Sequence, residues 1–509
     1  MGVRTVRVLG ASLAGTEAEL VTVEARFEDR PRERTEVSIT GLPDTVIREG
    51  KGRLLSALEA NALHVPPGRL FLNLVPAARR KAGETLDLPL VLAAAAACGH
   101  LEARSLRWKL FLGEVGLDGE LHAVPGGLAA ALAARERGVF QLVAPPATAR
   151  EAAWIPGVEA LGAERLEQVV SHLCAGGKPL CAVEPAGLPA AGPGPEVLDE
   201  VRGQASAKLA LAAAAAGGHG LLLIGPPGAG KSMLARRLAS LLPEPTLAER
   251  LEITRVLSAT GRWPGGLAHE RPLRAPHHTV SYAGLVGGGS PPVAGEITLA
   301  HGGVLFLDEL PEFRREALEA LRQPLESGWV LISRAGRRLE LPARFQLVAA
   351  MNPCPCGYRG HPRVPCRCPP AIVERYLRRI SGPLLDRIEL RIEVAAPTFD
   401  ELAPQDGQPD PSPRGVDLRR MVERATASAR ERQGERSNAA LDAAELDRLV
   451  PLDAHGRALL ERAARARALS ARALSALRRV ARTLADLEGE PRAGAEHLAR
   501  ALALRAWNR

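Results

Sequence analysis

The sequence predicts an α/β protein of several domains, and three observations support this. The chain has 509 residues, a glycine-rich phosphate-binding pattern lies between a strand-like and a helix-like segment, and the pattern is helical from residue 416 onward. Since a single hydrophobic core stops growing at about 250–300 residues, a chain of this length divides into two or three domains. Apolar residues at 46% and charged residues at 24% are the usage of a globular protein.

Composition places four expected segments along the chain. Residues 1–180 alternate strand-like and helix-like runs and should form a mixed α/β domain. Residues 181–196 contain the uncharged run PAGLPAAGPGP, in which proline and glycine oppose both helix and strand, so we expect a linker. Residues 197–400 form a central α/β domain around the phosphate-binding pattern. Residues 401–509 form an all-α domain with arginine and glutamate on its solvated faces.

Charge and cysteine content indicate which partners and which cellular compartment suit the protein. The formal net charge of +8 favours a polyanionic partner, but it is spread over a long chain that is also rich in acidic residues. The N-terminal apolar run is too short for a secretory signal, and no window reaches the ~18 apolar residues of a membrane span. We therefore expect a cytoplasmic protein in which the isolated Cys98, Cys174 and Cys181 stay reduced and act as small core residues.

The central domain begins with a phosphate-binding loop. GPPGAGKS follows the apolar run LLLI and precedes a helix-like segment, which is the context that a P-loop requires. Its glycines let backbone N–H groups wrap an anion, the lysine reaches the β- and γ-phosphates, and the serine hydroxyl binds Mg²⁺. The predicted ATP-binding residues are Gly225, Pro226, Pro227, Gly228, Ala229, Gly230, Lys231 and Ser232.

Two later strand-like runs end in polar residues that fit ATP hydrolysis. VLFLDEL ends in adjacent carboxylates, of which Asp308 can complete the Mg²⁺ shell with Ser232 and Glu309 can orient and deprotonate a water. QLVAAM is followed by Asn352, whose amide can reach between the γ-phosphate and the attacking water. Each residue taken alone would be an ordinary strand-end or turn residue. The P-loop in the same chain is what favours the catalytic interpretation.

A cysteine cluster follows directly on Asn352. Two C-x-C pairs nine residues apart supply four thiols within a proline-rich stretch, and tetrahedral coordination of Zn²⁺ is the natural use of such a cluster. A bound zinc would hold a loop that has little regular structure of its own. Reduced free thiols are the alternative, and His361 is a spare ligand. The predicted zinc ligands are Cys354, Cys356, Cys366 and Cys368.

The order of these motifs resembles that of the AAA+ ATPases. The P-loop, the Asp-Glu strand, the strand before Asn352, SGPLLDRIEL at 381–390 and a helical C-terminal lid follow one another as in that superfamily. More narrowly, HHTVSYAGLVGGGSPPVAGEITLAHGGVLFLDELPEF and NPCPCG resemble the YifB/ComM family of magnesium-chelatase-like AAA+ ATPases, and the resemblance covers the whole chain. It implies ATP and Mg²⁺ as substrate and cofactor, and a homo-oligomeric ring that we expect to be hexameric.

The resemblance also implies roles for further residues. By its position in the motif order, Arg387 would be the arginine finger that enters a neighbouring subunit's site, and Arg472 would be the sensor arginine of the lid. A delocalised guanidinium suits both roles, because it can neutralise charge spread over the transferring phosphoryl oxygens. The run LDEVRGQASAKLALAAAAAGG before the P-loop strand is expected to be a helix, and by the resemblance its residues Val201, Arg202, Gly203 and Gln204 would line the adenine.

A predicted hairpin supplies the candidate DNA contact. Residues 329–345 contain two strand-like runs around a turn at Ala335 and Gly336, and in related AAA+ motors a hairpin in this place points into the pore of the ring. A cationic tip suits a phosphate backbone, although exposed arginines are more commonly just solvated. The predicted DNA-contacting residues are Arg334, Arg337 and Arg338.

Two adjacent histidines lie in a second candidate loop, RAPHHTVSYAGLVGGG at residues 274–289, whose glycines suit a mobile segment beside the pore. His277 and His278 resemble a pair of metal ligands. Because the sequence places no acid or cysteine pair near them, we expect ordinary loop hydrogen bonds instead.

The N-terminal domain resembles the protease-type domain of Lon, which has the ribosomal protein S5 domain 2-like fold. GLPDTVIREGKGRLLSALEANAL and LFLGEVGLDGELHAVPGGLAAALAARERGVFQLVAP carry the likeness. A Ser-Lys dyad needs a hydroxyl nucleophile beside a lysine base, but Ala129 stands at the lysine position and Thr85, in the serine region, has no base. We therefore expect an oligomerisation and nucleic-acid-associated module without proteolytic activity.

The leading hypothesis is a ring-forming, Mg²⁺-dependent ATPase that translocates on DNA, resembling a branch-migration helicase that promotes DNA integration in natural transformation and recombination. The DNA partner, single-stranded or branched, follows from the resemblance and from the cationic hairpin. Two other classes stay open: a chelatase-like motor subunit that drives metal insertion into a small molecule, and a protein-remodelling chaperone. A chelatase motor would need a separate metal-handling subunit, and a chaperone would respond to unfolded protein.

Overall fold

The computed structural model describes most of the chain. The described residues are 5–30, 35–41, 44–76, 84–185, 195–263, 265–289, 293–334, 337–361, 363–396, 412–467, 469–505 and 507. The structure describes the backbone alone at residues 44–49, 84, 195–196, 333–334, 337–338 and 467. The greater part of the predicted linker, residues 186–194, therefore lies outside the described residues.

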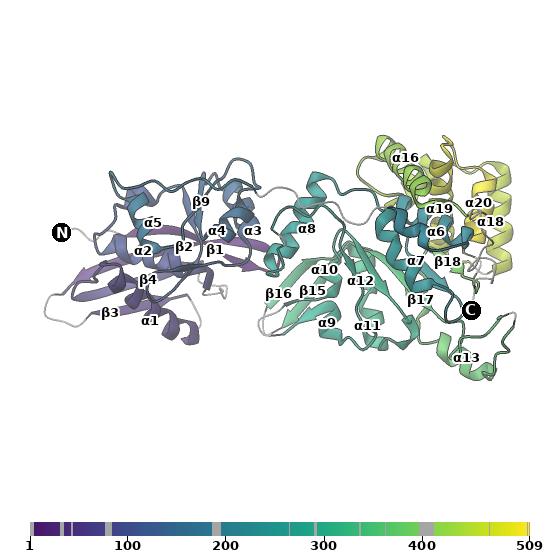
Figure 1. Ribbon diagram of the computed structural model, residues 1–509, viewed down its shortest axis with the longest axis horizontal. Coiled ribbons are helices and arrows are strands. Elements are labelled where there is room, and N and C mark those ends of the chain that lie inside the picture. Colours follow the sequence, from purple (N-terminus) through teal and green to yellow (C-terminus); the bar gives the residue numbers. More distant parts are fainter. Residues whose placement is uncertain are drawn as a thin grey trace. The chain divides into compact units, whose positions relative to one another are not determined.

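The described chain forms two compact units, which are shown in Figure 1. The first unit comprises residues 1–190 together with 250–268, and the second comprises residues 191–249 and 269–509. This differs in two respects from the predicted three-domain division. Residues 250–268 belong to the N-terminal unit, and the C-terminal helices are not a separate unit.

The first unit is built on a seven-stranded mixed sheet with the order β3-β4-β2-β1-β5-β8-β9. β2 pairs antiparallel with β1 and β4, whereas the pairs β3–β4, β1–β5, β5–β8 and β8–β9 are parallel. A small antiparallel pair, β6–β7, lies outside this sheet. The strands are β1 (Val6–Ala14), β2 (Glu17–Asp29), β3 (Glu36–Thr40), β4 (Gly68–Val75), β5 (Lys109–Phe111), β6 (Glu114–Val115), β7 (Leu121–His122), β8 (Gln141–Ala144) and β9 (Glu159–Gly162).

Three helices of the first unit, α2, α3 and α4, are rich in alanine. α2, with the sequence DLPLVLAAAAA, is buried along almost its whole length and therefore has no polar face, which explains its continuous apolar pattern. The helices are α1 (Asp44–Ala60), α2 (Asp87–Ala97), α3 (Gly127–Glu136), α4 (Pro146–Ala152), α5 (Leu166–Leu173) and most of α8 (Leu247–Ala259), with 3₁₀ turns at Glu84–Leu86 and Ala103–Leu106.

Specific contacts tie the segment around α8 to the N-terminal sheet. Leu267 joins the apolar cluster formed with α3 and α4. The hydroxyl of Ser258 donates to the buried carboxylate of Glu151 at 2.5 Å, and the backbone N–H of Gly127 donates to the same carboxylate at 2.9 Å. Glu151 is more than a hundred residues away from Ser258 in sequence, so the sequence of α8 did not reveal to which unit the helix belongs.

The second unit contains a five-stranded parallel sheet with the order β11-β14-β17-β10-β18. β17 lies between β10, which leads into the P-loop, and β14, which ends in the two carboxylates. The strands are β10 (Leu221–Ile224), β11 (Leu273–Arg274), β14 (Val304–Leu307), β17 (Gln346–Met351) and β18 (Leu390–Glu393). Two antiparallel pairs accompany the sheet: β12 (Gly287–Gly288) with β13 (Val293–Ala294), and β15 (Trp329–Arg334) with β16 (Arg337–Pro342).

Helices flank this sheet and continue to the C-terminus. The predicted helix before the P-loop is interrupted, because Gly203 and Gln204 have φ values of +63° and +55°. The helices are α6 (Ala205–Gly217), α7 (Lys231–Arg237), α9 (Tyr282–Val286), α10 (Glu296–Leu299), α11 (Arg315–Ala320), α12 (Arg322–Ser327), α13 (Pro370–Leu377), α14 (Gly382–Asp386), α16 (Gly415–Gln433), α17 (Ala443–Leu449), α18 (Ala454–Arg467), α19 (Ala471–Glu488) and α20 (Ala495–Ala503). 3₁₀ turns occur at Pro195–Glu200, Leu238–Leu241, Leu310–Glu312 and Asn438–Ala440.

The predicted C-terminal helices are present, but they share a core with the parallel sheet. Leu418 and Val422 of α16 and Leu477 of α19 belong to the same buried cluster as Leu211 of α6 and Leu221 of β10. Figure 1 shows α16 and α19 beside α6. This continuous apolar core explains why the described chain forms two units. None of the described helices is both long enough and apolar enough to cross a membrane.

Candidate nucleotide site and cysteine cluster

The phosphate-binding loop connects β10 to α7. Gly228 and Gly230 have φ values of +77° and +83°, a left-handed conformation that other residues adopt only with strain. Gly225 is needed for a different reason, since a Cβ atom there would lie 2.2 Å from the carbonyl oxygen of Val394. The loop thus requires glycine at two positions for conformation and at a third for close approach.

The Lys231 ammonium lies within the loop. It donates to the carbonyl oxygens of Gly225 and Pro226 at 2.8 Å each and to Oδ1 of Asn352 at 3.1 Å. Burial lowers the pKa of Lys231, and the carboxylates of Asp308 and Glu309 partly oppose this shift. The structure therefore brings the predicted phosphate-binding lysine and the predicted sensor asparagine into contact.

The predicted magnesium ligands are also in contact. Ser232 donates its hydroxyl to Oδ2 of Asp308 at 2.5 Å, and Oδ1 of Asp308 accepts the backbone N–H of Glu309 at 2.9 Å. A hydroxyl and a carboxylate are hard oxygen ligands of the kind that Mg²⁺ prefers. The two side chains meet because Ser232 opens α7 and Asp308 follows β14 at the same end of the parallel sheet.

The structure places a histidine on the predicted water-orienting carboxylate. Nδ1 of His278 lies 3.2 Å from Oε2 of Glu309, and the His278 ring packs edge-on against Phe313 with ring centroids 6.4 Å apart. Glu309 itself has a φ of +52°. The expectation that no acid lies near the histidine pair is therefore wrong for His278. His277 does make the expected loop hydrogen bond, because its Nδ1 lies 2.9 Å from the hydroxyl of Thr279.

The predicted adenine-lining residues precede α6. Gln204 donates from Nε2 to the carbonyl oxygen of Ala395 at 2.8 Å. The neighbouring Val394 donates its N–H to Ile224, the last residue before the P-loop. Residues 202–204 are thus joined to the end of β18 that packs against the phosphate loop. No local pattern indicates this placement, because it depends on a strand almost two hundred residues later.

Two predicted arginines converge on one carboxylate. Arg387 and Arg472 both donate to Oε1 of Glu326 in α12, with Arg472 at 2.6 Å. Burial lowers the pKa of Arg387, whereas the charge of Glu326 raises it and that of Arg472 lowers it. The ion pairs found for these two guanidiniums among the described residues run to Glu326 and not to the phosphate loop. The Glu326 carboxylate therefore holds the two guanidiniums close to each other.

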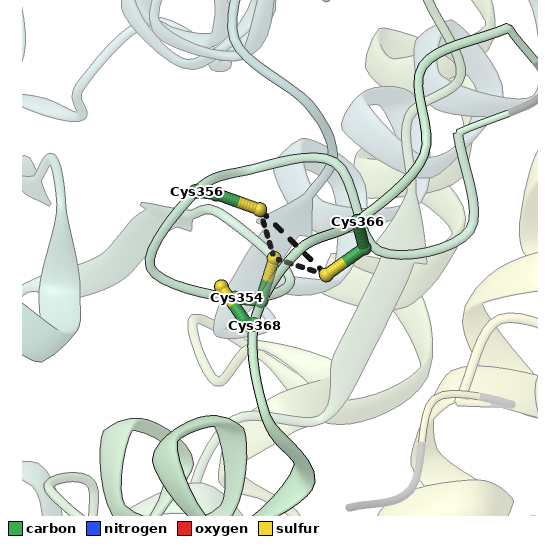
Figure 2. Close-up of side chains that lie close together, drawn as sticks. All are labelled: Cys354, Cys356, Cys366 and Cys368. Carbon is green, nitrogen blue, oxygen red and sulfur yellow. Dashed lines mark hydrogen bonds between the residues drawn. The ribbon is translucent and has the colours of Figure 1, made fainter.

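The four predicted zinc ligands form one cluster, which Figure 2 shows in close-up. All four sulfur atoms lie within 4.8 Å of one another. Sγ of Cys354 is 3.4 Å from that of Cys356 and 3.6 Å from that of Cys366, and Cys356 and Cys366 are also 3.6 Å apart. Zinc–sulfur bonds of about 2.3 Å in a tetrahedron give sulfur–sulfur distances of about 3.8 Å, so the cluster fits Zn²⁺.

The thiols of the cluster differ in how readily they lose a proton. Burial, followed by the neighbouring Cys356 sulfur, raises the pKa of Cys354 to about 12. The backbone N–H of Tyr358 lowers the pKa of Cys356 to about 6. His361 does not join the cluster; its Nδ1 accepts the N–H groups of Arg363 and Val364 at 3.1 and 2.9 Å. The suggestion of His361 as a spare ligand finds no support in this geometry.

The cysteine loop lies against the phosphate loop. A Cβ atom on Gly357, which has a φ of +85°, would lie 2.5 Å from Cδ of Pro227. Gly357 also donates its N–H to the carbonyl oxygen of Cys354 at 2.9 Å. The segment that follows Asn352 is thereby connected both to the sulfur cluster and to the loop that would hold the β- and γ-phosphates.

Comparison with known proteins assigns a family. Three models match the chain: subunit ChlI of Mg-chelatase at residues 23–148, magnesium chelatase subunit ChlI at 197–402, and the C-terminal part of magnesium chelatase subunit ChlI at 414–505. Competence protein ComM of Haemophilus influenzae is 40% identical over 508 residues, which cover 97% of this chain and 96% of that protein. The chain belongs to the YifB/ComM family.

Other members of the YifB/ComM family match at similar levels. The uncharacterized protein YifB of Escherichia coli is 39% identical over 510 residues, covering 97% of this chain and 96% of YifB. The uncharacterized protein Rv2897c of Mycobacterium tuberculosis is 38% identical over 508 residues, covering 98% of each chain. As a member of the YifB/ComM family with a magnesium chelatase domain, the chain is an AAA+ ATPase, which implies ATP and Mg²⁺ at the P-loop.

For two further predictions on this YifB/ComM protein, the structure describes the backbone element or the burial of the residues concerned. The hairpin exists, with Arg334 paired to Arg337 in the β15–β16 register, but the side chains of the three predicted DNA-contacting arginines, Arg338 included, lie outside the described residues. In the first unit, Ala129 is buried in α3 and Thr85 is buried in a 3₁₀ turn.

Two functional candidates were missing from the sequence-based prediction. Glu326 is the common partner of Arg387 and Arg472, and His278 contacts Glu309. Glu326 follows an ordinary amphipathic pattern, so no local signal distinguishes it. The His-His pair did supply a signal, but it was interpreted without knowing that β11 and β14 are neighbours in the sheet.

Proposed function

We propose that this protein is a ring-forming, Mg²⁺-dependent ATPase that translocates on DNA, and that it acts as a branch-migration helicase when DNA is integrated during natural transformation or recombination. The observation that carries the proposal is the position of the β15–β16 hairpin. β16 ends at Pro342 and β17 begins at Gln346, so the hairpin is attached directly to the strand that presents Asn352 to Lys231. A change at the γ-phosphate is thereby linked through one strand to three arginines.

The arginine pair supports the ring. Because Arg387 and Arg472 contact Glu326 and not the phosphate loop of their own chain, we propose that both act on ATP bound by a neighbouring subunit. An arginine supplied in this way neutralises charge on the transferring phosphoryl group. We propose a hexameric ring. Ser232 and Asp308 would hold the Mg²⁺, Glu309 would orient and deprotonate the water, and Asn352 would sense the γ-phosphate.

The DNA partner is supported by two further considerations. A relative that is 40% identical over almost the whole chain is named as a competence protein. Arginines near the turn of a hairpin suit a phosphate backbone, which binds cations along its length. We also propose that the first unit has the Lon-protease-like fold without its catalytic dyad and serves in oligomerisation and nucleic-acid contact, since Ala129 supplies no amine.

The test is the ATPase rate of the full chain with and without single-stranded or branched DNA. We expect DNA to stimulate hydrolysis, and we expect a variant with Arg334, Arg337 and Arg338 changed to Gln to lose the response to DNA. A second function has one observation in its favour, because all three matching models describe a magnesium chelatase subunit. A chelatase-type motor would ignore DNA and respond to a metal-handling partner subunit, and that result would overturn the DNA proposal.

A further inference from the structure

Two exposed aromatic rings lie side by side on the first unit. Trp108 is 65% exposed and Phe140 is 62% exposed, and their ring centroids are 6.4 Å apart with an interplanar angle of 50°. Aromatic residues make up 3% of the chain, so an exposed pair stands out. Large apolar side chains of this kind are normally buried, and an exposed aromatic pair is typical of a binding surface.

The register of the sheet places the two rings together. Lys109, at the start of β5, pairs with Gln141 at the start of β8, and Gln141 pairs with Glu159 of β9. Trp108 and Phe140 are the residues immediately before two neighbouring parallel strands, so their side chains emerge at the same edge of the sheet. The rings are therefore adjacent because of the fold and not because of a flexible loop.

Backbone hydrogen bonds hold this edge in place. The carbonyl oxygen of Trp108 accepts the N–H groups of Phe140 and Gln141 at 3.3 and 3.4 Å. Trp108 has a φ of +61°, which is rare for a bulky residue. Two of the other three described non-glycine residues with positive φ, Gln204 and Glu309, lie at the nucleotide site. Such backbone conformations are enriched at functional positions, where the surrounding structure holds the strain.

Positive charge surrounds the rings. Arg107 and Lys109 flank Trp108 in the chain and line the same open hollow of about 670 Å³. Glu159 also lines the hollow, and its carboxylate accepts a hydrogen bond from Nε2 of Gln141 at 2.7 Å. The lining thus has two cations to one carboxylate, and that carboxylate already has a partner. This combination of ring faces and cations complements a ligand that alternates flat bases with phosphates.

From these observations we infer that Trp108 and Phe140 form a stacking platform for the bases of single-stranded nucleic acid, with Arg107 and Lys109 contacting the adjacent phosphates. The inference rests on the proposed function, since it gives the first unit a role in holding the strand on which the ATPase acts. A specific protein partner would need about 800 Å² on this surface. Among the remaining lining residues only Val158 has an apolar side chain, and it is buried, so the exposed apolar area does not reach that size.

The test compares the full-length wild type with W108A/F140A in binding to labelled oligo(dT) and to an abasic oligonucleotide of the same length. Stacking of one base on an aromatic ring changes affinity by about fivefold or more, so we expect W108A/F140A to bind oligo(dT) at least about fivefold more weakly. Binding to the abasic strand should be unchanged, because it has phosphates but no bases. Leu117→Ala, on an apolar residue that is 61% exposed on the same unit, is the matched control.

The two cations have a different expected signature. R107Q/K109Q should weaken binding to both oligonucleotides equally. It should also reduce the slope of log affinity against log salt by up to about 1.4, which corresponds to two lost phosphate contacts on a single strand. Both rings are exposed, so the variants should keep the wild-type thermal melting temperature, and Trp108→Phe should retain most of the binding.

Four outcomes decide the inference. A selective loss of oligo(dT) binding supports the platform. Unchanged binding by W108A/F140A overturns it while leaving the DNA proposal intact. W108A/F140A could instead fail to oligomerise while its assembled fraction keeps the wild-type affinity for DNA. That result would show that the two aromatic side chains contact another protein chain, and it would also overturn the inference. A wild type that neither binds nor responds to any DNA refutes the proposed function itself, and the platform with it.

Discussion

Asp308 and Glu309 are neighbours in sequence but have different surroundings. Asp308 accepts hydrogen bonds from Ser232 and from the backbone of Glu309. The left-handed backbone at Glu309 turns its side chain away from this pair, towards His278. One carboxylate is therefore arranged for a metal shell, while the other remains half-exposed and available to a water.

Changing the proposed base should separate ATP binding from hydrolysis. We expect Glu309→Gln to bind ATP but to hydrolyse it about 10²- to 10⁴-fold more slowly, because the amide cannot take a proton from the water. Lys231→Ala should instead lose ATP binding, since the ammonium is the cation within the phosphate loop. Equilibrium binding of labelled ATP and single-turnover hydrolysis distinguish the two variants. Normal hydrolysis by Glu309→Gln would mean that another group activates the water.

The contact between His278 and Glu309 should restrain the unstimulated enzyme. We expect His278→Ala to raise the basal ATPase rate by at most about fivefold, because a polar contact to an exposed carboxylate is worth no more than ~1 kcal/mol. The response to DNA should shrink correspondingly. His277→Ala is the control for the loop, since that ring packs on His278 with centroids 4.1 Å apart and contacts Thr279, while the contact to Glu309 is made by His278. Equal effects of both substitutions on the basal rate would indicate a general loosening of the loop.

The cysteine loop, between Asn352 and Pro370, contains no helix or strand among its described residues, so its path must be held by other interactions. It leaves β17 after Asn352, passes Gly357 against Pro227 of the phosphate loop, and reaches α13 at Pro370. A tetrahedral metal site closed by four thiolates would fix this path. The loop then becomes a support for the phosphate loop as well as a connection to α14 and Arg387.

Zinc should be present at about one ion per chain, and its affinity should fall as the pH falls. The pKa of Cys354 is raised to about 12, so this thiol carries its proton at neutral pH and must release it when zinc binds. The pKa of Cys368 is raised as well, so zinc binding releases at least two protons and the affinity falls by at least about a hundredfold per pH unit. Below pH 6 the fall should steepen, because the pKa of Cys356 is about 6 and this thiol then binds a proton too.

Elemental analysis and competition with a chromogenic chelator between pH 5 and about pH 8 would measure this. Cys354→Ser should lose the zinc and weaken ATP binding through Gly357 and Pro227, whereas Cys98→Ser, on an isolated thiol, should change neither. Metal-free protein with four freely titrating thiols would remove the zinc assignment.

At the scale of the whole molecule, the arginine pair predicts that the active unit is an assembly. We expect Arg387→Ala to assemble and to bind ATP but to hydrolyse it about 10³- to 10⁵-fold more slowly, the range for loss of an arginine finger. Mixing Arg387→Ala with Lys231→Ala subunits should restore part of the activity. A mixed interface can combine the intact phosphate loop of one subunit with the intact finger of the next.

The recovery is measured as the ATPase rate of mixed rings against the sum of the two separate variants. Glu326→Gln is the informative companion variant, because it removes the carboxylate that holds both arginines and leaves the arginines themselves in place. Mixed rings that show no gain over the sum would place Arg387 in a role within its own chain, and would remove the main argument for a ring.

The sequence alone determined the parts of this protein that depend on local rules. The phosphate loop needs glycine at fixed offsets, the strand before Asp308 is a continuous apolar run, and four cysteines at C-x-C spacing are recognisable without a fold. The resemblance to the YifB/ComM family came from motifs of the same kind, and it was confirmed by relatives that match almost the whole chain.

The tertiary structure decided what depends on pairing between distant segments. The sheet order put β17 between β10 and β14 and so brought Asn352 to Lys231. Packing also assigned residues 250–268 to the first unit, joined α16 and α19 to the core of the parallel sheet, and gathered Arg387 and Arg472 on Glu326. The physical reason is that burial and ion pairing act between surfaces, whereas periodicity reports only which face of an element is apolar and never which partner covers it.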